Sequence, residues 1–227
     1  DMRNKLNEYI NDCRLCVQTK VSRHSSGAAH LIPFGEWPFD VCSADAYDTG
    51  WKRADGSKVE IVSFGCNFCR GIFSDVPTSP PTSRYICDTL VKLIFRYFGV
   101  CRYFYSDAGS IFVAKVVQLL LRHYGTRVRS SASHHHRSVG LVERWHSVCG
   151  QLLRALAKTK LGKSKDYIQL HLDVHMAWLN LSFNTAINSL TKQSPAFLMT
   201  LRQLRLPDDA LFAPLKKPKK ISEHLEI

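Results

Sequence analysis

The sequence lacks the long apolar segment that a membrane-spanning helix requires. No apolar run reaches eighteen residues, whereas a helix that crosses a bilayer needs about 20, so we expect no membrane partner. Internal repeats and long low-complexity segments are also absent. The first ten residues resemble neither a signal peptide nor a natural translation start. We therefore expect the chain to be a piece of a longer polypeptide.

Acidic residues are scarce relative to basic ones. The 227 residues include 31 Lys and Arg but 19 Asp and Glu, which gives a formal net charge of +12. This excess suits a polyanionic partner, nucleic acid before a membrane surface, because Lys and Arg replace counterions along phosphates. A merely soluble basic protein is the alternative, and composition alone does not separate the two. The 45% hydrophobic content allows a sizeable core and argues against wholesale disorder.

The eight cysteines do not have the distribution of a disulfide framework. Several lie inside apolar runs, as Cys87 and Cys101 do. This placement is typical of buried thiols in a reducing compartment.

Hydrophobic periodicity and turn residues predict an α/β fold with a mixed sheet, because three strands are followed by alternating helices and strands. Asp55-Gly56 indicates a hairpin turn, and Thr82 or Ser83 is a plausible helix N-cap. The expected strands are residues 39–47, 59–66, 71–76, 101–106 and 126–131. The expected helices are residues 84–99, 111–125 and 141–159, followed by a helical segment to about residue 200 with one break near Ser194-Pro195.

Two of these helices carry an apolar stripe at helical spacing. In the helix expected over residues 84–99, the stripe comprises Ile86, Leu90, Leu93 or Ile94, and Tyr97. Gly99 should end this helix. In the third, the stripe comprises Leu141, Trp145, Val148, Leu152 and Leu156, and Glu143 lies off it.

Three acidic residues stand at informative places. Asp45 lies within an otherwise apolar strand, Asp107 ends a strand, and Glu143 lies in the first turn of a helix. Taken singly, each reads as an ordinary solvated acid. Together they could converge on one sheet edge, where Mg²⁺, which prefers oxygen ligands, would offset their mutual repulsion. Two such ions about 4 Å apart would hold the attacking and leaving oxygens of a phosphoryl transfer.

Motifs around these acids resemble the integrases of retroviruses and long-terminal-repeat retrotransposons, especially the gypsy type. Residues 106–112, SDAGSIF, are similar to the family's S-D-x-G-x-x-F, and residues 138–144, SVGLVER, to its S-x-G-x-V-E-R. Residues 108–142 give the family's spacing of 35 between the second Asp and the Glu. Further similarities are Trp37 to Asp45, Phe183-Asn184-Thr185, Ser194 to Phe197, and Leu204 to Pro207, so the resemblance covers roughly residues 10–210.

This resemblance implies a ribonuclease-H-like fold, a five-stranded mixed sheet flanked by helices. It implies that Asp45, Asp107 and Glu143 bind two Mg²⁺ or Mn²⁺ ions. The activities it implies are endonucleolytic 3′-end processing and strand transfer on double-stranded DNA, both element ends and target. It also implies a homo-oligomer that acts in the nucleus after import from the cytoplasm. The expected domains are a remnant of a zinc-binding domain with its linker (1–32), the catalytic core (33–200) and a basic tail (201–227).

The loop before Glu143 departs from the family pattern. Residues 134–137, HHHR, replace the family's Y-H-P-Q, and Val139 replaces a polar residue. Neither change removes a metal ligand. A catalytically inactive or domesticated DNA-binding remnant is therefore the alternative to an active enzyme. A ribonuclease H proper is disfavoured because no fourth carboxylate stands in a suitable place.

Two C-x-x-C pairs are candidate zinc ligands. Cys13 and Cys16 end an expected helix over residues 1–20, and they resemble the second half of the family's His-His-Cys-Cys zinc domain. The two histidines would lie upstream, since His24 and His30 come after the pair, so we expect a partial zinc site here and Zn²⁺ only in a longer protein. We interpret Cys66 and Cys69 as core or hairpin cysteines, not a second zinc site.

Basic residues accompany the acids. Arg144, Arg154 and Lys158 share the helix of Glu143, and His135 matches a family histidine; all four are expected to contact DNA. A solvated charged face is the alternative for the helix. The Lys216–Lys220 cluster would serve as a nuclear address, a DNA tether, or a linker toward a further domain.

Overall fold

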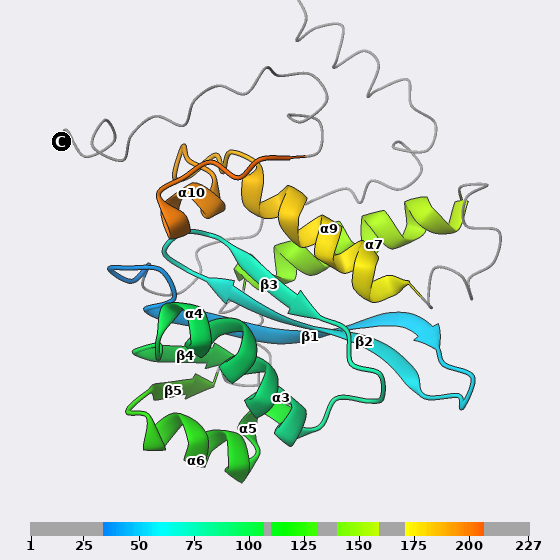
Figure 1. The fold of residues 1–227 in the computed structure, drawn as a ribbon. Coiled ribbons are helices and arrows are strands. Elements are labelled where there is room, and N and C mark those ends of the chain that lie inside the picture. The colour runs from blue at the N-terminus through cyan, green and yellow to red at the C-terminus, as the bar shows by residue number, and fades with distance from the viewer. Residues whose placement is uncertain (1–33, 107–109, 131–139, 159–170, 207–227) are drawn as a thin grey trace, which may run out of the picture.

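A computed structural model describes residues 34–106, 110–130, 140–158 and 171–206 of the chain. At its centre is a five-stranded sheet with the strand order β3-β2-β1-β4-β5 (Figure 1). The strands are β1 (Val41–Lys52), β2 (Lys58–Cys66), β3 (Ile72–Asp75), β4 (Tyr103–Ser106) and β5 (Arg127–Ser130).

Strand β1 is the central strand, and its two neighbours run in opposite directions. It pairs antiparallel with β2, where Asp45 faces Ser63, and parallel with β4, where Ala44 faces Ser106. Strand β3 continues the antiparallel half, and β5 continues the parallel half. The mixed five-stranded sheet that the sequence predicts is confirmed.

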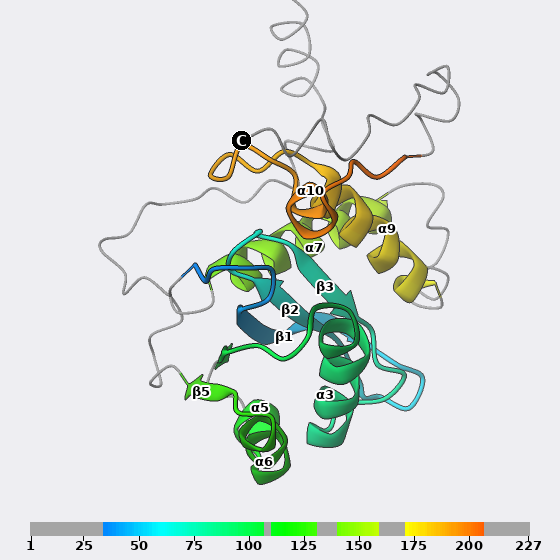
Figure 2. The same ribbon diagram turned by 60° about the vertical axis from the view of Figure 1, so that its left-hand side comes forward.

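Helices cover both faces of the sheet (Figures 1 and 2). On one face, α7 packs against β1 and β2, and α9 packs against β3. On the other face, α3 packs against α6, and α6 contacts β5. The helical segments are α3 (Ser83–Leu90), η1 (Val91–Phe95), α4 (Arg96–Phe98), α5 (Ser110–Val113), α6 (Lys115–His123), α7 (Gly140–Lys158), α9 (Leu172–Thr185) and α10 (Pro195–Thr200).

Each face of the sheet has its own hydrophobic cluster, because alternate residues of a strand point to opposite faces. In β2, Val62 and Phe64 join the cluster under α3 and α6, whereas Val59 and Ile61 join the cluster under α7 and α9. The sheet is therefore the middle layer of three.

The helix expected over residues 84–99 begins with Thr82 as its N-cap, and Gly99 follows it with φ of +77°. The expected position of Tyr97 on the buried face is wrong, since Tyr97 is 65% exposed. The π-helical segment η1 adds a residue to the turn and shifts the later residues around the axis. Phe98 packs inward instead, with its ring centroid 4.7 Å from that of Phe39.

Two further helical predictions need correction. The helix expected over residues 111–125 is interrupted at Ala114, whose ψ of 143° is extended, so α5 and α6 are separate. The helical segment expected up to residue 200 stops at Thr185, and α10 starts only at Pro195, with Ser194 as its N-cap. In both places the backbone leaves the helical region without a proline or glycine at the break.

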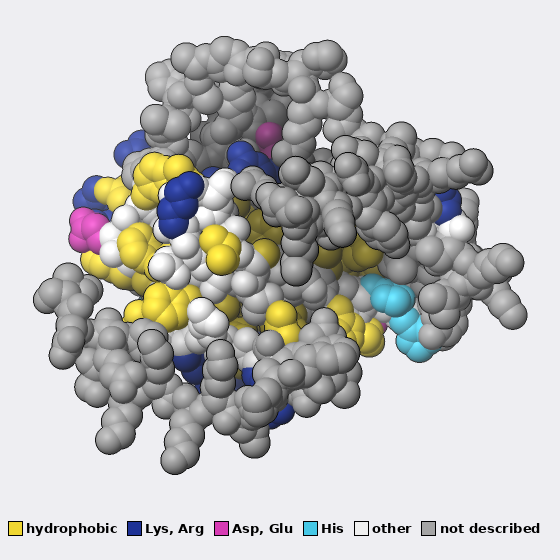
Figure 3. Space-filling view, turned by 90° about the horizontal axis from the view of Figure 1, so that it is seen from above, with side chains coloured by type: hydrophobic (Ala, Val, Ile, Leu, Met, Phe, Trp, Pro, Cys, Tyr) yellow, Lys and Arg dark blue, Asp and Glu magenta, His cyan; other side chains and the backbone are white. Residues whose placement is uncertain are grey.

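The surface above α9 and α10 is viewed in Figure 3, which shows hydrophobic side chains (yellow) gathered across its centre. Val174 and Trp178 of α9 are among the exposed hydrophobic side chains, at 48% and 53%.

Within the described part of the chain, no helix is long and apolar enough to span a bilayer.

Candidate active site

Asp45 lies in the middle of β1, on the face of the sheet that α7 covers. Its side chain is 18% exposed, and its Oδ1 accepts a hydrogen bond of 2.8 Å from the backbone N–H of Ala46. A carboxylate on the central strand of a rigid sheet has a fixed position. The other carboxylate oxygen, Oδ2, points toward α7.

The partner of that oxygen is His146, a buried residue of α7. Its Nδ1 lies 3.3 Å from Asp45 Oδ2, and its Nε2 lies 3.1 Å from the Ser63 hydroxyl. The imidazole also stacks on the Tyr47 ring at a centroid distance of 5.2 Å. Both ring nitrogens therefore have partners, and the orientation of the ring is fixed from three sides.

Behind Ser63, a line of polar groups continues into the sheet. The hydroxyls of Ser63 and Ser74 are 3.0 Å apart, and the Trp145 indole N–H donates to the Ser74 hydroxyl at 2.7 Å. One donor order satisfies the whole line: Trp145 to Ser74, Ser74 to Ser63, Ser63 to His146 Nε2, and His146 Nδ1–H to Asp45. In that order His146 accepts at Nε2 and donates from Nδ1 to the carboxylate.

Glu143 lies in the first turn of α7, three residues before His146. It is half-buried and borders a cavity of about 300 Å³. Residues three apart share one side of a helix, so Glu143 and His146 face the same space. The cavity is lined by Tyr47, Glu143, His146, Ser147, Gly150 and Arg154.

Two glycines allow α7 to approach the sheet closely. A Cβ at Gly65 of β2 would lie 3.0 Å from the side chains of both Leu141 and Val142. A Cβ at Gly150 would lie 2.7 Å from the Tyr47 hydroxyl. The absence of side chains at these positions therefore sets the distance between Glu143 and the sheet.

The buried stripe of α7 differs from the predicted one. Leu141 and Trp145 are buried as expected, whereas Val148 and Leu152 are only half-buried. The fully buried positions are Val142, Trp145, Cys149 and Leu153. Hydrophobic periodicity alone does not reveal this one-residue offset, because apolar residues occupy both candidate stripes. The offset also turns His146 toward the sheet.

Several residues singled out in the sequence lie outside the described residues. They are Cys13, Cys16, Asp107 and His135. The last described residue before Asp107 is Ser106, which pairs with Ala44, the neighbour of Asp45. Among the described residues, no group of three His, Cys, Asp or Glu side chains is arranged to hold a metal ion.

The chemistry of the carboxylates nevertheless suits a hard divalent cation. Asp45 and Glu143 offer oxygen donors, which Mg²⁺ prefers. Glu143 borders a cavity, and among the described residues the polar partner of Asp45 Oδ2 is the His146 imidazole. The donor type therefore fits Mg²⁺ or Mn²⁺, with Asp107 as the residue that would complete the set.

One basic side chain, Arg154, lines this cavity. Arg144 and Lys158 are exposed on the same helix but are not among the lining residues. Burial raises the pKa of the Tyr47 hydroxyl, while the nearby Arg154 guanidinium opposes that rise. The site therefore combines two carboxylates with positive charge at its rim.

The Cys66–Cys69 pair forms the turn after β2, where both residues are fully buried. Cys66 Sγ accepts hydrogen bonds from the backbone N–H groups of Phe39 at 3.0 Å and Cys69 at 3.4 Å. Burial raises the pKa of Cys66. Hydrogen bonds from the Cys69 thiol and from these N–H groups lower it by more, so the pKa lies below its usual value. The prediction of core or hairpin cysteines is confirmed.

His146 and Tyr47 are the site residues that the sequence reading missed. His146 follows Glu143 by one helical turn, and Tyr47 follows Asp45 by one strand repeat. Both therefore share a face with a candidate carboxylate, and that spacing is the signal that could have identified them.

By sequence, the chain is similar to retrotransposon polyproteins, although no family model matches it. It is 20% identical over 207 residues to the retrovirus-related Pol polyprotein from transposon 412 of Drosophila melanogaster. The matched region covers 91% of this chain and 16% of that polyprotein. It is 23% identical over 195 residues to the transposon Tf2-3 polyprotein of Schizosaccharomyces pombe, covering 86% of the chain and 14% of the polyprotein. The chain thus spans about a sixth of these relatives.

By fold, the chain is similar to retroviral integrases. The simian T-cell lymphotropic virus intasome in complex with a PP2A regulatory subunit gives a TM-score of 0.62 at 15% identity, over 89% of this chain and 68% of that one. The magnesium-bound catalytic core of HTLV-2 integrase gives a TM-score of 0.54 at 15% identity, and the match covers 73% of this chain and 99% of that one. The catalytic core of BIV integrase gives a TM-score of 0.51 at 18% identity, and the match covers 71% of this chain and 93% of that one. The chain therefore resembles retrotransposon polyproteins in sequence and shares the ribonuclease-H-like fold of the retroviral integrase catalytic cores.

Proposed function

We propose that the chain cuts and joins DNA strands in a metal-dependent reaction, as the catalytic part of a retroelement integrase. Asp45, Asp107 and Glu143 are the proposed ligands of Mg²⁺ or Mn²⁺. The observation that supports this most directly is the contact of His146, one turn after Glu143, with Asp45 Oδ2 at 3.3 Å. It connects two candidate ligands that are far apart in the sequence.

In the proposed reaction the protein positions the carboxylates and the DNA. When bound, the divalent ions would supply charge neutralisation at the attacking and leaving oxygens of the phosphoryl transfer. Asp45 is held by the Ala46 N–H and by His146, so its carboxylate needs little reorganisation. Arg154 beside the cavity would bind a phosphate of the DNA.

The proposed substrates are double-stranded element ends and target DNA. The proposed steps are 3′-end processing, a hydrolysis, and strand transfer, in which the new 3′ hydroxyl attacks the target. Arg144, Lys158 and His135 are proposed further DNA contacts, and the nucleus is the proposed site of action. A homo-oligomer is proposed because the HTLV-2 integrase core occurs in trimeric and dimeric forms.

A joining assay with a labelled duplex oligonucleotide tests this function. Wild type should form joined products in Mg²⁺ or Mn²⁺ and none in EDTA, and Asp45→Asn should form none. Asp48→Asn is the matched control, because Asp48 lies on the same strand but pairs with Lys58 at the surface. Normal joining by Asp45→Asn would exclude Asp45 as a ligand. Metal-independent DNA binding by an inactive wild type would favour the inactive, domesticated alternative.

A further inference from the structure

The outer half of the sheet carries tyrosines and arginines in register. Tyr103 of β4 pairs with Arg127 of β5, and Tyr105 pairs with Arg129. Because side chains alternate along a strand, these four share one face, while Phe104 and Val128 pack into the cluster on the other face. We name Tyr103, Tyr105, Arg127 and Arg129 the tyrosine–arginine platform.

The platform is accessible and its charge is not neutralised by acids. Both arginines are exposed and both tyrosines are half-buried. Arg127 donates to the Tyr103 hydroxyl at 3.4 Å and lies 5.8 Å from the ring centre. In the described part of the chain, neither Arg127 nor Arg129 forms an ion pair with a carboxylate.

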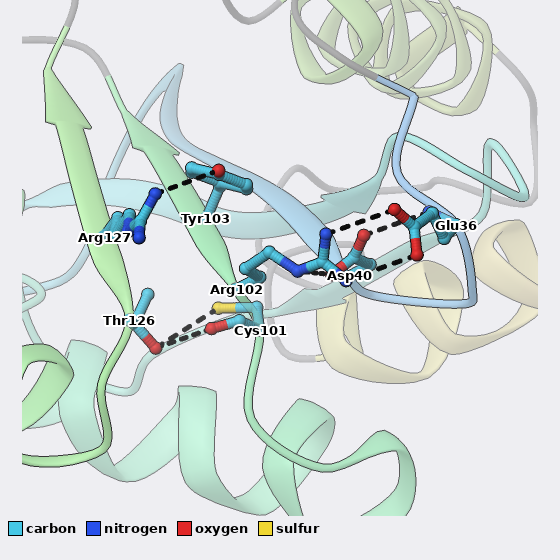
Figure 4. A network of polar contacts seen from close by, with 7 residues as sticks. All are labelled: Glu36, Asp40, Cys101, Arg102, Tyr103, Thr126 and Arg127. Atoms are coloured by element: carbon cyan, nitrogen blue, oxygen red, sulfur yellow. Dashed lines mark hydrogen bonds and ion pairs between the residues drawn. The ribbon is translucent and has the colours of Figure 1, made fainter.

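Arg102, at the start of β4, provides a contrast within the same region. Its guanidinium lies 3.2 Å from the buried Asp40 and 3.3 Å from Glu36 (Figure 4). Arg102 therefore stabilises the fold, because its charge is already matched. Figure 4 shows Arg127 beside Tyr103, away from those two acids.

The platform continues the sheet face that carries Asp45. Tyr105 pairs with Ser43 of β1, and Asp45 follows Ser43 by one strand repeat on the same face. With a rise of about 3.3 Å per residue and a strand spacing of about 4.8 Å, Asp45 and Tyr105 lie roughly 8 Å apart along the sheet. A nucleic-acid strand placed at Asp45 would extend onto the platform.

Half-buried tyrosine rings next to exposed guanidinium groups that form no ion pair with a described carboxylate suit an unpaired nucleotide strand. Bases stack on aromatic rings of a sheet, and arginines bind the phosphates between them. A duplex hides the faces of its bases within the stack, so it could use only the arginines. We propose that the tyrosine–arginine platform binds an unpaired DNA strand that leaves the candidate active site. This inference rests on the proposed function, since DNA is the proposed substrate.

Fluorescence anisotropy with a labelled oligothymidine, in EDTA, tests the platform without any joining reaction. Tyr105→Leu should weaken single-strand binding by about fivefold or more, the scale of one lost base stack, whereas Tyr105→Phe should retain it. Arg129→Gln should reduce the salt dependence of single-strand binding by about 0.7 in log–log slope. The same variants should change the binding of a blunt duplex less.

The chain offers a matched control pair. Arg96 lies 5.5 Å from the ring centre of the exposed Tyr97 on α4, away from the sheet face. Tyr97→Leu and Arg96→Gln remove the same kinds of group and should leave single-strand binding within about twofold of wild type. Thermal melting checks that every variant is folded. Photocrosslinking of wild type to an oligonucleotide with 5-iododeoxyuridine should give adducts on Tyr103 or Tyr105.

Unchanged single-strand affinity in Tyr105→Leu, equal losses in the control pair, or an equal loss of duplex binding would overturn the proposal. Adducts confined to other residues would also overturn it. The result is separable from the proposed function. If wild type joins DNA while platform variants bind normally, only the platform fails. If wild type joins no DNA but Tyr105→Leu still loses single-strand affinity, only the proposed catalysis fails.

Discussion

The Nδ1 atom of His146 lies 3.3 Å from Oδ2 of Asp45, while its Nε2 lies 3.1 Å from the Ser63 hydroxyl. A helix residue is thereby held between two neighbouring strands. Because Glu143 precedes His146 by one turn of the same helix, this contact fixes how α7 is rotated relative to Asp45. The buried imidazole contacts Asp45, and the helix that carries it places Glu143 one turn away.

The His146 contact predicts a loss of both stability and joining when the imidazole is removed. His146→Ala should lower the free energy of unfolding by about 1–3 kcal/mol, since Ser63 loses a buried partner. Joining should fall at least about tenfold, because Asp45 loses its orienting donor. His146→Asn can still donate to Asp45 and should recover part of the activity. Denaturant unfolding and joining rates are measured together; wild-type joining by His146→Ala would contradict the positioning role.

The close approach of α7 to β2 predicts that Gly65→Ala is harmful. The added methyl would lie 3.0 Å from the side chains of Leu141 and Val142, so these side chains must give way, which pushes on the first turn of α7. We expect a destabilisation of about 1–3 kcal/mol and reduced joining, because Glu143 belongs to that turn. Gly56→Ser is the control, because Gly56 lies in the exposed hairpin turn with φ of +81° and an added Cβ there would have no atom within 4 Å. This substitution therefore strains the backbone without crowding a neighbour. Joining reduced as much by Gly56→Ser as by Gly65→Ala would contradict this explanation.

The hydrogen bond from Trp145 to Ser74 predicts a specific cost for losing one N–H group. Trp145→Phe keeps an aromatic ring in the cluster but removes the 2.7 Å bond to the Ser74 hydroxyl. Together with the smaller ring, this should lower the free energy of unfolding by about 2 kcal/mol. Trp178→Phe is the control, since Trp178 is 53% exposed, and it should change stability by less than about 0.5 kcal/mol. Similar losses of unfolding free energy in the two variants would argue against a stabilising role of the hydrogen bond from Trp145 to Ser74.

The buried thiols predict slow modification of the native protein. Burial raises the pKa of Cys101 to about 12 and also raises the pKa of Cys42 and Cys149. A raised pKa leaves little thiolate at pH 8, and the thiolate is the reactive form. Ellman's reagent at pH 8 should therefore leave these thiols unmodified until denaturant is added. Rapid modification of Cys42, Cys101 or Cys149 in the native protein, located by mass spectrometry, would contradict their burial.

Features set by local patterns were predictable from the sequence. The strand of Asp45, the Thr82 cap and the stop at Gly99 each depend on a few adjacent residues. The π-helical segment before Tyr97 and the break at Ala114 were not, because no proline or glycine marks either place in the sequence. His146 was missed for a related reason: its partners, Asp45 and Ser63, lie about 100 and 83 residues away in the chain.

The most direct test of the central claim, metal-dependent joining through the carboxylates, is the joining rate of Glu143→Gln beside wild type in Mg²⁺ and in Mn²⁺. The substitution keeps the size of the side chain but removes a charged oxygen ligand, so joining should be abolished in both metals while DNA affinity persists. Glu60→Gln, on the opposite face of β2, is the matched control and should join normally. Joining by Glu143→Gln at the wild-type rate would contradict the account.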